Sequence, residues 1–288
     1  MRKRIKTLTA FFAAIAVISL ILFYLVGSRL AAPAYRKIGQ PPKGLKAEDI
    51  SIVSSGEKQI KGWLFRSDQK NGVIILMHGI RGNRTAMLGR AKFLFADGYS
   101  VLLFDFQAHG ESDGEHITFG YLESQDTRAA VNFARKQYPS QPVGVIAQSL
   151  GGAACLIGES PIEADALILE SVYPSIEEAV ANRLEIYVGK IGRCFTPILT
   201  MQLQFRFDID PDKLRPEHGI GKLRCPVFLI NGSADRRTTL SETRRLYHAA
   251  PEPKELWIVQ EARHVDLHRF GKVRYEKRVS AFLKKHFL

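Results

Sequence analysis

The 288-residue sequence predicts an α/β fold with a mostly parallel, doubly wound sheet between layers of helices. Two observations carry this prediction. Short apolar runs alternate with helical patterns along most of the chain, as in proteins built from successive strand–helix units. Several of these runs, such as VIILM and the VLLF of VLLFD, are apolar at every position. Such runs are typical of strands buried on both faces of a parallel sheet.

The strands and helices can be placed along the chain by these patterns. Strands are expected at 50–53, 60–65, 72–77, 100–105, 143–147, 166–169, 227–230 and 256–259. Apolar residues recur at helical spacing between them, for example at Leu122, Ala129 and Phe133. The stretch at about 173–224 interrupts the alternation and contains many large apolar residues. We expect it to form extra helices, which either pack on the core or cover a site as a lid, and the two roles are compatible.

The first 28 residues have the pattern of a membrane anchor. Residues 7–28 form a run of 22 residues without charge, and four basic residues precede it. A helix of this run rises about 33 Å at about 1.5 Å per residue, enough to cross a hydrocarbon core of about 30 Å. A cleavable signal peptide has the same plan, with Ala32-Pro33-Ala34 as its cleavage site. Its apolar core is usually only about 7–15 residues, however, so the length favours an uncleaved transmembrane helix.

The net charge of +12 is concentrated around this apolar run. Residues 1–46 hold nine of the 41 Lys and Arg residues and no Asp or Glu, which leaves 32 basic and 29 acidic residues in the rest of the chain. No basic stripe with interleaved aromatic residues is present, so no nucleic-acid partner is expected. The basic N-terminus predicts a single-pass protein of the cell membrane whose main domain, 48–288, is extracytoplasmic. Residues 29–47, which contain three prolines, are expected to be a linker.

One serine lies where a nucleophile would be expected. Ser149 stands between the predicted strand VGVIA and a helical segment. A reactive serine at a sharp strand-to-helix turn needs small residues two positions before and after it, and Ala147 and Gly151 meet this need. The helix that follows points its N-terminus at the site, which favours developing negative charge. The alternative is a glycine-rich turn at an ordinary helix start.

Two further residues complete a candidate catalytic triad. Asp235 follows the strand VFLI and His264 follows the strand LWIV, so both lie at carboxyl ends of strands, where open α/β sheets place their sites. The chain order Ser149, Asp235, His264 is that of α/β-hydrolases. Glu170, at the end of the strand ALIL, is an alternative acid. Asp266 and His268 lie close after His264, but His264 is nearer the strand end. Asp105 and His109 are expected to belong to a structural loop under the site.

The segment after the strand VIILM is the candidate oxyanion loop. It reads His78-Gly79-Ile80, and Gly79 allows the backbone to approach closely. The backbone N–H groups of Ile80 and Leu150 are expected to hold the negative oxygen that forms during acyl transfer. His78 is expected to brace this loop rather than to act as a base.

The cysteines give no sign of a metal site. Cys155, Cys194 and Cys225 form no CxxC pair and have no metal-ligand spacing. We expect three unpaired thiols, with a Cys194–Cys225 bridge as the alternative in an exported domain. No metal and no other cofactor is expected.

These motifs resemble those of the α/β-hydrolase superfamily over about residues 48–288. The branch of serine aminopeptidase-like and prolyl-oligopeptidase-like hydrolases fits best. HGIRGN resembles its oxyanion loop, FDFQAHGESDG its D-x-R-G-x-G-x-S-x-G segment, and 117–135 the helix that follows. The sequence departs from the branch's pattern at Ala147, where Gly is commoner, and at Gln107, where Arg is usual. It also has Arg236-Arg237-Thr238 where many members have a small apolar residue and Pro, which is expected to reshape one pocket wall.

The resemblance implies a serine hydrolase fold with a helical lid and a cofactor-free reaction through an acyl-enzyme. A small-molecule ester or related acyl substrate is expected ahead of a peptide with a small N-terminal residue. A third hypothesis is a non-catalytic, membrane-anchored binding protein on the same fold, which loss of a triad member would have favoured. The sequence does not specify the substrate or the oligomeric state.

Overall fold

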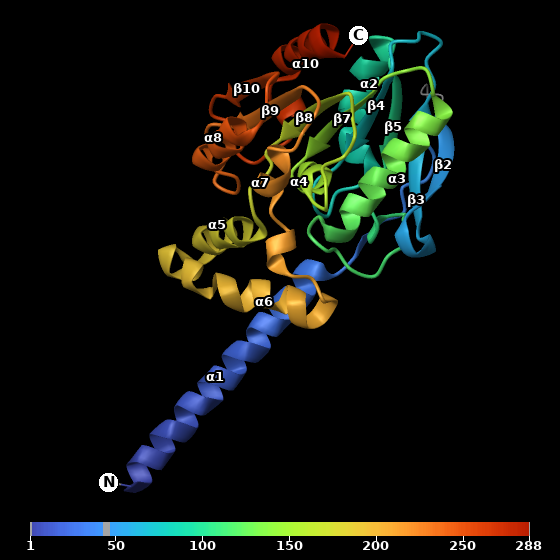
Figure 1. Cartoon of the computed structure of the whole chain (residues 1–288). Coiled ribbons are helices and arrows are strands. Elements are labelled where there is room, and N and C mark those ends of the chain that lie inside the picture. The colour runs from blue at the N-terminus through green and yellow to red at the C-terminus, as the bar shows by residue number, and fades with distance from the viewer. Residues whose placement is uncertain (1, 43–46, 288) are drawn as a thin grey trace.

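The centre of the molecule is a mostly parallel β-sheet (Figure 1). The computed structural model describes residues 2–42 and 47–287, and within them the sheet has eight strands in the order β10-β9-β8-β7-β4-β5-β3-β2. All neighbouring strands are parallel except at β5-β3 and β3-β2. The prediction of a mostly parallel sheet is therefore confirmed. The strands are β2 (Glu48–Val53), β3 (Gln59–Phe65), β4 (Val73–Met77), β5 (Ser100–Phe104), β7 (Val143–Gln148), β8 (Ala166–Glu170), β9 (Val227–Gly232) and β10 (Lys254–Val259).

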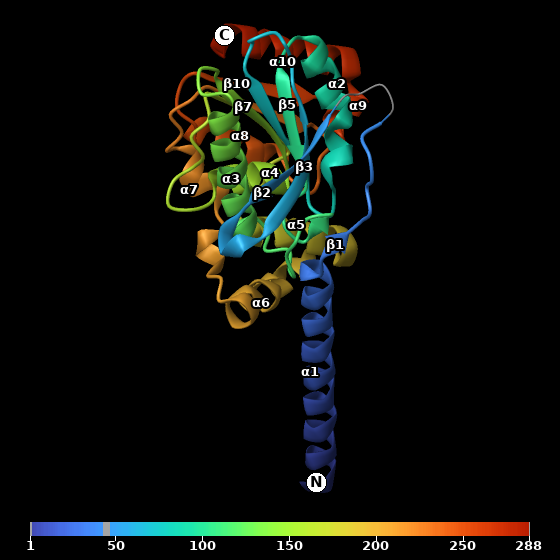
Figure 2. The same cartoon turned by 90° about the vertical axis from the view of Figure 1, so that its right-hand side faces the viewer.

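Helices cover both faces of the sheet (Figure 2). Side chains alternate between the faces, so Ile75 and Met77 of β4 belong to one apolar core whereas Ile74 and Leu76 belong to the other. The first core packs against α3 (Tyr121–Gln137), α4 (Leu150–Leu156) and α8 (Leu240–Ala249), and the second against α2 (Leu88–Ala96) and α10 (Lys272–His286). This double cover explains why the inner strands β4, β5 and β8 are buried at every position.

The long insertion lies between β8 and β9. It contains α5 (Ile176–Val188), η3 (Lys190–Phe195), α6 (Thr196–Phe207), η4 (Pro211–Lys213) and α7 (Pro216–Ile220). Ser175 begins α5 by accepting a hydrogen bond from the Glu178 N–H. In Figure 1, α5 and α6 lie on the side of the domain from which α1 projects. We call the segment α5–η3–α6 the lid, after its expected role.

The N-terminal helix α1 (Arg2–Ala31) projects away from the domain (Figures 1 and 2). Its part Lys6–Ala31 is long and apolar enough to cross a membrane, and the side chains of its most apolar window are not buried against the rest of the chain. A core helix of a soluble domain would instead be mostly buried. A signal sequence near the N-terminus can pass the same test of length and apolarity, so this helix can be either an anchor or a signal.

The segment after α1, expected to be a linker, contacts the main domain. The two-residue strand β1 (Ala34–Tyr35) pairs with β6 (His109–Gly110), and the Ile38 N–H donates to Glu111. Residues 43–46 of the expected linker lie outside the described residues. All three cysteines are described and are free. Cys194 is exposed in η3 and Cys225 is buried, so the structure does not contain the alternative disulfide.

Candidate active site

Ser149 occupies a strained turn between β7 and α4. Its backbone has φ 49° and ψ −108°, a conformation that non-glycine residues rarely adopt. The Ser149 N–H donates to the Glu170 carbonyl at 2.8 Å, and the Ser149 carbonyl accepts from the Ala153 N–H at 2.9 Å. These two bonds hold the turn between the sheet and the first turn of α4.

The glycines after Ser149 are required by close packing. A Cβ atom at Gly151 would lie 2.9 Å from both the His78 carbonyl oxygen and Met77 Cβ. A Cβ atom at Gly152 would lie 2.2 Å from Val172 Cγ2. Both distances are shorter than carbon atoms allow, so small residues are needed here for the turn to form.

Asp235 and His264 are brought together by a direct hydrogen bond. The distance from His264 Nδ1 to Asp235 Oδ2 is 2.8 Å, and the Asp235 side chain is fully buried. Asp235 Oδ1 accepts from the backbone N–H groups of Arg237 at 2.8 Å and Thr238 at 3.0 Å. A carboxylate held in this way accepts a proton-bearing Nδ1, which leaves His264 Nε2 as the acceptor.

The three candidate triad residues lie at the same edge of the sheet, since they follow the parallel strands β7, β9 and β10. Ser149 Oγ, however, makes no hydrogen bond to His264 within residues 2–42 and 47–287. Catalytic hydrogen bonds are often long or poorly aligned before substrate binds, so a missing hydrogen bond between Ser149 and His264 is compatible with a triad.

The candidate oxyanion loop contacts Ser149. A Cβ atom at Gly79 would lie 3.6 Å from Ser149 Cβ, and Ile80 packs against the small apolar cluster that contains Leu150. The Gly79 carbonyl accepts from His78 Nδ1 at 2.8 Å and from the Gly82 N–H at 3.0 Å. Because the C=O and N–H of a trans peptide point in opposite directions, these two bonds fix the direction of the Ile80 N–H.

Two buried histidines brace this loop as neutral groups. His78 Nε2 accepts from the Phe106 N–H at 3.2 Å, so the ring proton is on Nδ1, which faces Gly79. His109 Nε2 accepts from the Arg81 N–H at 3.1 Å. Burial, and secondarily the nearby His109, lowers the pKa of His78 to about 3. The contact from His109 to Arg81 carries no local sequence signal, because it joins two separate loops.

The neutral state of His78 predicts acid sensitivity. Its folded pKa of about 3 lies below the usual value of 6.5, so the unfolded chain binds the proton more readily between these values. The contribution of neutral His78 to the free energy of unfolding is therefore complete above pH 6.5 and is lost as the pH drops towards 3. At pH 5 this loss is about 2 kcal/mol. Urea unfolding of the full chain at pH 7.5 and pH 5 measures this. The loss is expected to be smaller in His78→Asn, and an equal loss in both proteins would contradict the assignment.

Glu170, the alternative acid, pairs with Arg90 and Tyr275 rather than with His264. Its side chain is fully buried and accepts from Arg90 Nε at 2.9 Å and from the Tyr275 hydroxyl. Arg90 Nη1 also lies 2.8 Å from Asp266 Oδ1. No hydrogen bond joins Glu170 to His264 among the described residues. Of the two carboxylates, Asp235 is the one that contacts the histidine.

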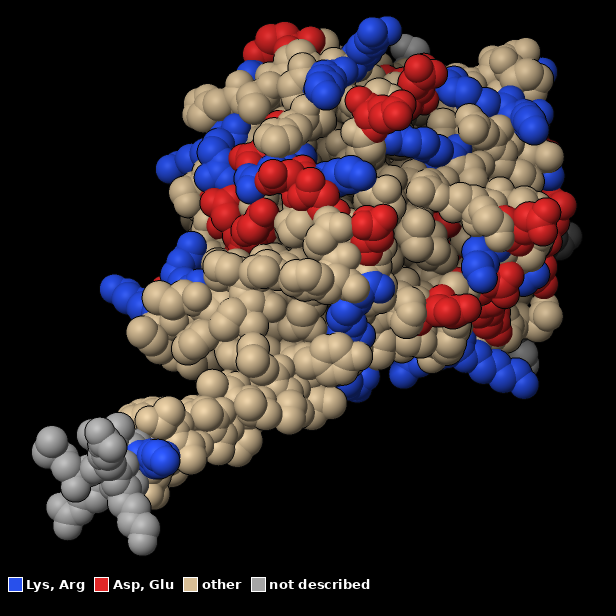
Figure 3. All heavy atoms as spheres, turned by 60° about the horizontal axis from the view of Figure 1, so that its bottom comes forward, with Lys and Arg blue, Asp and Glu red and all other residues tan. Residues whose placement is uncertain are grey.

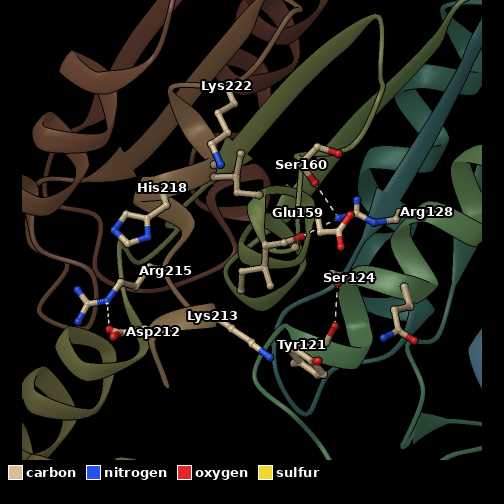
Figure 4. A pocket seen from close by; sticks show the side chains of 15 residues that line it. Tyr121, Ser124, Arg128, Glu159, Ser160, Asp212, Lys213, Arg215, His218 and Lys222 are labelled. Carbon is tan, nitrogen blue, oxygen red and sulfur yellow. Dashed lines mark hydrogen bonds and ion pairs between the residues drawn. The ribbon is translucent and has the colours of Figure 1, made fainter. Parts of the chain in front are cut away.

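A separate hollow lies at the other end of α4. Figure 4 shows that its lining comes from α3, the loop after α4 and the η4–α7 segment, and that basic side chains surround it. Leu156 and Ile157 line it, whereas Ser149 begins the helix at its opposite end. It is therefore not part of the candidate catalytic site. Among the described residues, no cluster of His, Cys, Asp or Glu could hold a metal ion.

Comparison with known proteins places the chain in a family. Residues 68–211, half of the chain, match the family model for serine aminopeptidase, S33. This region contains Ser149 and the oxyanion loop but neither Asp235 nor His264.

Similar proteins span most of the chain. Protein YqkD of Bacillus subtilis (strain 168) is 27% identical over 239 residues, which cover 81% of this chain and 77% of YqkD. Protein YfhR of Escherichia coli (strain K12) is 27% identical over 254 residues, covering 84% and 82%. A solved esterase of Pyrococcus furiosus is 26% identical with a TM-score of 0.74, covering 89% of this chain and all of that chain. The family match and the eight-stranded sheet agree, and the chain belongs to the serine aminopeptidase S33 family of α/β-hydrolases.

Proposed function

We propose that this protein is a membrane-anchored serine hydrolase that cleaves a carboxylic ester or a related acyl bond. Ser149 is the nucleophile, His264 the general base and Asp235 the acid that orients it. The observation that carries the proposal is the 2.8 Å hydrogen bond from His264 Nδ1 to Asp235, at the same sheet edge as the strained Ser149. A buried, doubly hydrogen-bonded carboxylate stabilises the imidazolium that forms when His264 takes a proton.

The reaction proceeds by acyl transfer in two steps. His264 Nε2 takes the proton of Ser149 Oγ as that oxygen attacks the ester carbonyl. The N–H groups of Ile80 and Leu150 stabilise the negative oxygen, and the leaving alcohol departs with the proton from His264. A water molecule, activated by His264, then attacks the acyl-enzyme. The acid is released, and the serine regains its proton from His264.

An ester is the proposed substrate rather than a peptide. The similar Pyrococcus furiosus protein is an esterase, and it matches this chain over nearly its whole length. The name of the matched family instead favours an aminopeptidase. Turnover of p-nitrophenyl esters against aminoacyl p-nitroanilides separates the two, and we expect only the esters to be hydrolysed.

The nucleophile is tested by labelling the full chain, in detergent, with a fluorophosphonate. Wild type is expected to be labelled and Ser149→Ala to be unlabelled. Ser171→Ala is a matched control, because Ser171 is also buried, follows a strand and has a positive φ of 51°. Labelling that survives in Ser149→Ala would exclude Ser149 as the nucleophile. A folded wild type that is not labelled would favour the non-catalytic binding protein.

The anchor is the second part of the proposal. The exposed apolar side chains of α1 support a helix that stays in the membrane, with the main domain on the extracytoplasmic side. Flotation of the full chain with lipid vesicles measures this. A protein that stays at the bottom of the gradient would contradict an uncleaved anchor.

A further inference from the structure

The lid contacts α1 at Phe23 and Tyr24, in the C-terminal third of that helix. Gln202 Nε2 on α6 donates to the Phe23 carbonyl at 3.0 Å. The rings of Phe23 and Phe195 have centroids 5.3 Å apart, and the Arg206 guanidinium lies 4.8 Å from the centroid of Tyr24. A hydrogen bond and a cation–π contact from α6, together with a ring contact from Phe195 at the end of η3, therefore hold the lid against α1 at one level of the helix. Figure 1 shows α6 lying across α1.

This level lies inside the uncharged run of α1. Phe23 stands five residues before Ser28, the last residue of the run, which is about 7.5 Å along the helix axis. Interfacial helices bury their apolar faces by about 5–10 Å at the boundary between headgroups and acyl chains. If the run of α1 spans the bilayer, α6 lies at this depth, because moving it outwards would break its contacts with Phe23 and Tyr24.

The surface of the lid suits that position. Its outward side chains include Phe205, Tyr187 and Ile191, which are 79%, 75% and 64% exposed, together with the exposed Val188 and Met201. We call these five residues the lid patch. Figure 3 shows the uncharged surface of α1 continuing onto the lid, with Lys and Arg at its margin. An apolar patch with a basic margin is typical of a surface that contacts anionic lipid.

The same end of α1 touches the candidate oxyanion loop. Arg81 Nη1 donates to the carbonyl oxygens of Arg29 at 3.3 Å and Ala32 at 3.2 Å. The Ile117 N–H donates to the Ala31 carbonyl at 2.9 Å. A small apolar hollow lies between the end of α1 and the lid, and its lining includes Leu30, Ala31, Phe119, Leu199 and Leu203. The edge of the sheet that bears Ser149 therefore lies where α1 would leave the membrane.

We propose that the lid patch is seated in the lipid leaflet from which α1 emerges, and that the site takes its substrate from that leaflet. The substrate class is an ester with a long acyl chain, because such a chain partitions into the bilayer and meets an apolar lid. The seating of the patch rests on the anchor alone. The origin of the substrate rests in addition on the proposed hydrolase function.

The seating is tested with nitroxide labels on the full chain in vesicles of phosphatidylcholine and phosphatidylglycerol. Phe205→Cys carries the label in a Cys194→Ser background, since Cys155 and Cys225 are buried. Val273→Cys is the matched control, because Val273 is 78% exposed on α10, at the end of the domain away from α1. Oxygen is expected to relax the label at 205 more strongly, and a water-soluble nickel chelate less strongly, than at 273.

Two outcomes would overturn the seating. Equal access of the nickel chelate to both positions would place the lid patch in water. Spin–spin broadening at 205 that disappears on dilution with unlabelled protein would show that a second copy covers the patch. Neither readout requires activity, so the seating can fail or hold independently of the hydrolase function.

The substrate is tested with two esters and one pair of variants. Ile191→Ser/Phe205→Ser is expected to lower turnover of vesicle-borne p-nitrophenyl palmitate about tenfold, because the double substitution removes two apolar side chains that would contact the leaflet. Turnover of soluble p-nitrophenyl acetate should not change, and Val273→Ser should affect neither ester. Equal loss on both esters, or none on the palmitate, would overturn the leaflet as the source. A wild type that hydrolyses neither ester would instead refute the proposed function.

Discussion

Replacing Asp235 by Asn is expected to lower kcat for ester hydrolysis by about 10⁴-fold while the protein stays folded. The hydrogen bonds at Asp235 give the reason. Oδ1 accepts from the N–H groups of Arg237 and Thr238, so an asparagine would keep its carbonyl oxygen there and turn its NH₂ group towards His264. The ring would then accept at Nδ1 and carry its proton on Nε2. In that tautomer it cannot take the proton of Ser149.

The measurement is kcat for a p-nitrophenyl ester, with circular dichroism as the test of folding. Asp266→Asn is the matched control, because Asp266 lies two residues after His264 but pairs with Arg90 instead. We expect Asp266→Asn to keep most of the activity. Full activity in Asp235→Asn would exclude Asp235 as the orienting acid.

The sheet could be predicted because its signal is local. Inner strands such as β4 and β5 contain apolar runs and are buried at every position, and two-sided burial in a parallel sheet is what such a run requires. The pairing of Ala34 with His109 was not predicted. It joins two-residue strands from segments far apart in the chain, and no periodic pattern exists over two residues.

The sequence predicts which residues form the candidate site but not the contacts that support them. The types and order of Ser149, Asp235 and His264 follow from strand ends and small neighbours. In the sequence, Arg237 and Thr238 stand out only as a departure from the family pattern, whereas in the structure their backbone amides hold Asp235. Backbone donors are present in every residue, so side-chain identity cannot reveal this role.

Glu170 illustrates the same limit. From the sequence it was an alternative acid, because it ends a strand at the right edge of the sheet. In the structure the Glu170 carboxylate instead accepts a hydrogen bond from Arg90, which is 80 positions away in the chain. A pairing over that distance depends on how α2 packs on the sheet, and the charge pattern along the chain does not specify that packing.

Replacing Arg90 by Met is expected to lower the free energy of unfolding by about 3–5 kcal/mol. Arg90 and Glu170 are both fully buried, so the variant leaves a buried carboxylate without its guanidinium. Arg90→Met/Glu170→Gln removes both charges and should recover part of the loss. Arg66→Met is the control, because the Arg66–Glu48 pair is exposed, and it should cost no more than about 1 kcal/mol.

Urea unfolding of the full chain in detergent measures all four proteins, and fluorophosphonate labelling reports on the site in each. The buried pair lies beside the turn that holds Ser149, since the Glu170 carbonyl accepts from the Ser149 N–H. The Glu170 carboxylate itself pairs with Arg90 and Tyr275, and among the described residues it makes no hydrogen bond to Ser149 or His264. The double variant should therefore keep Ser149 labelling under conditions in which it is folded. Loss of labelling from the folded double variant would mean that the buried pair acts on the reaction and not only on stability. A double variant no more stable than Arg90→Met would show that the loss of stability in Arg90→Met does not come from an unpaired buried charge.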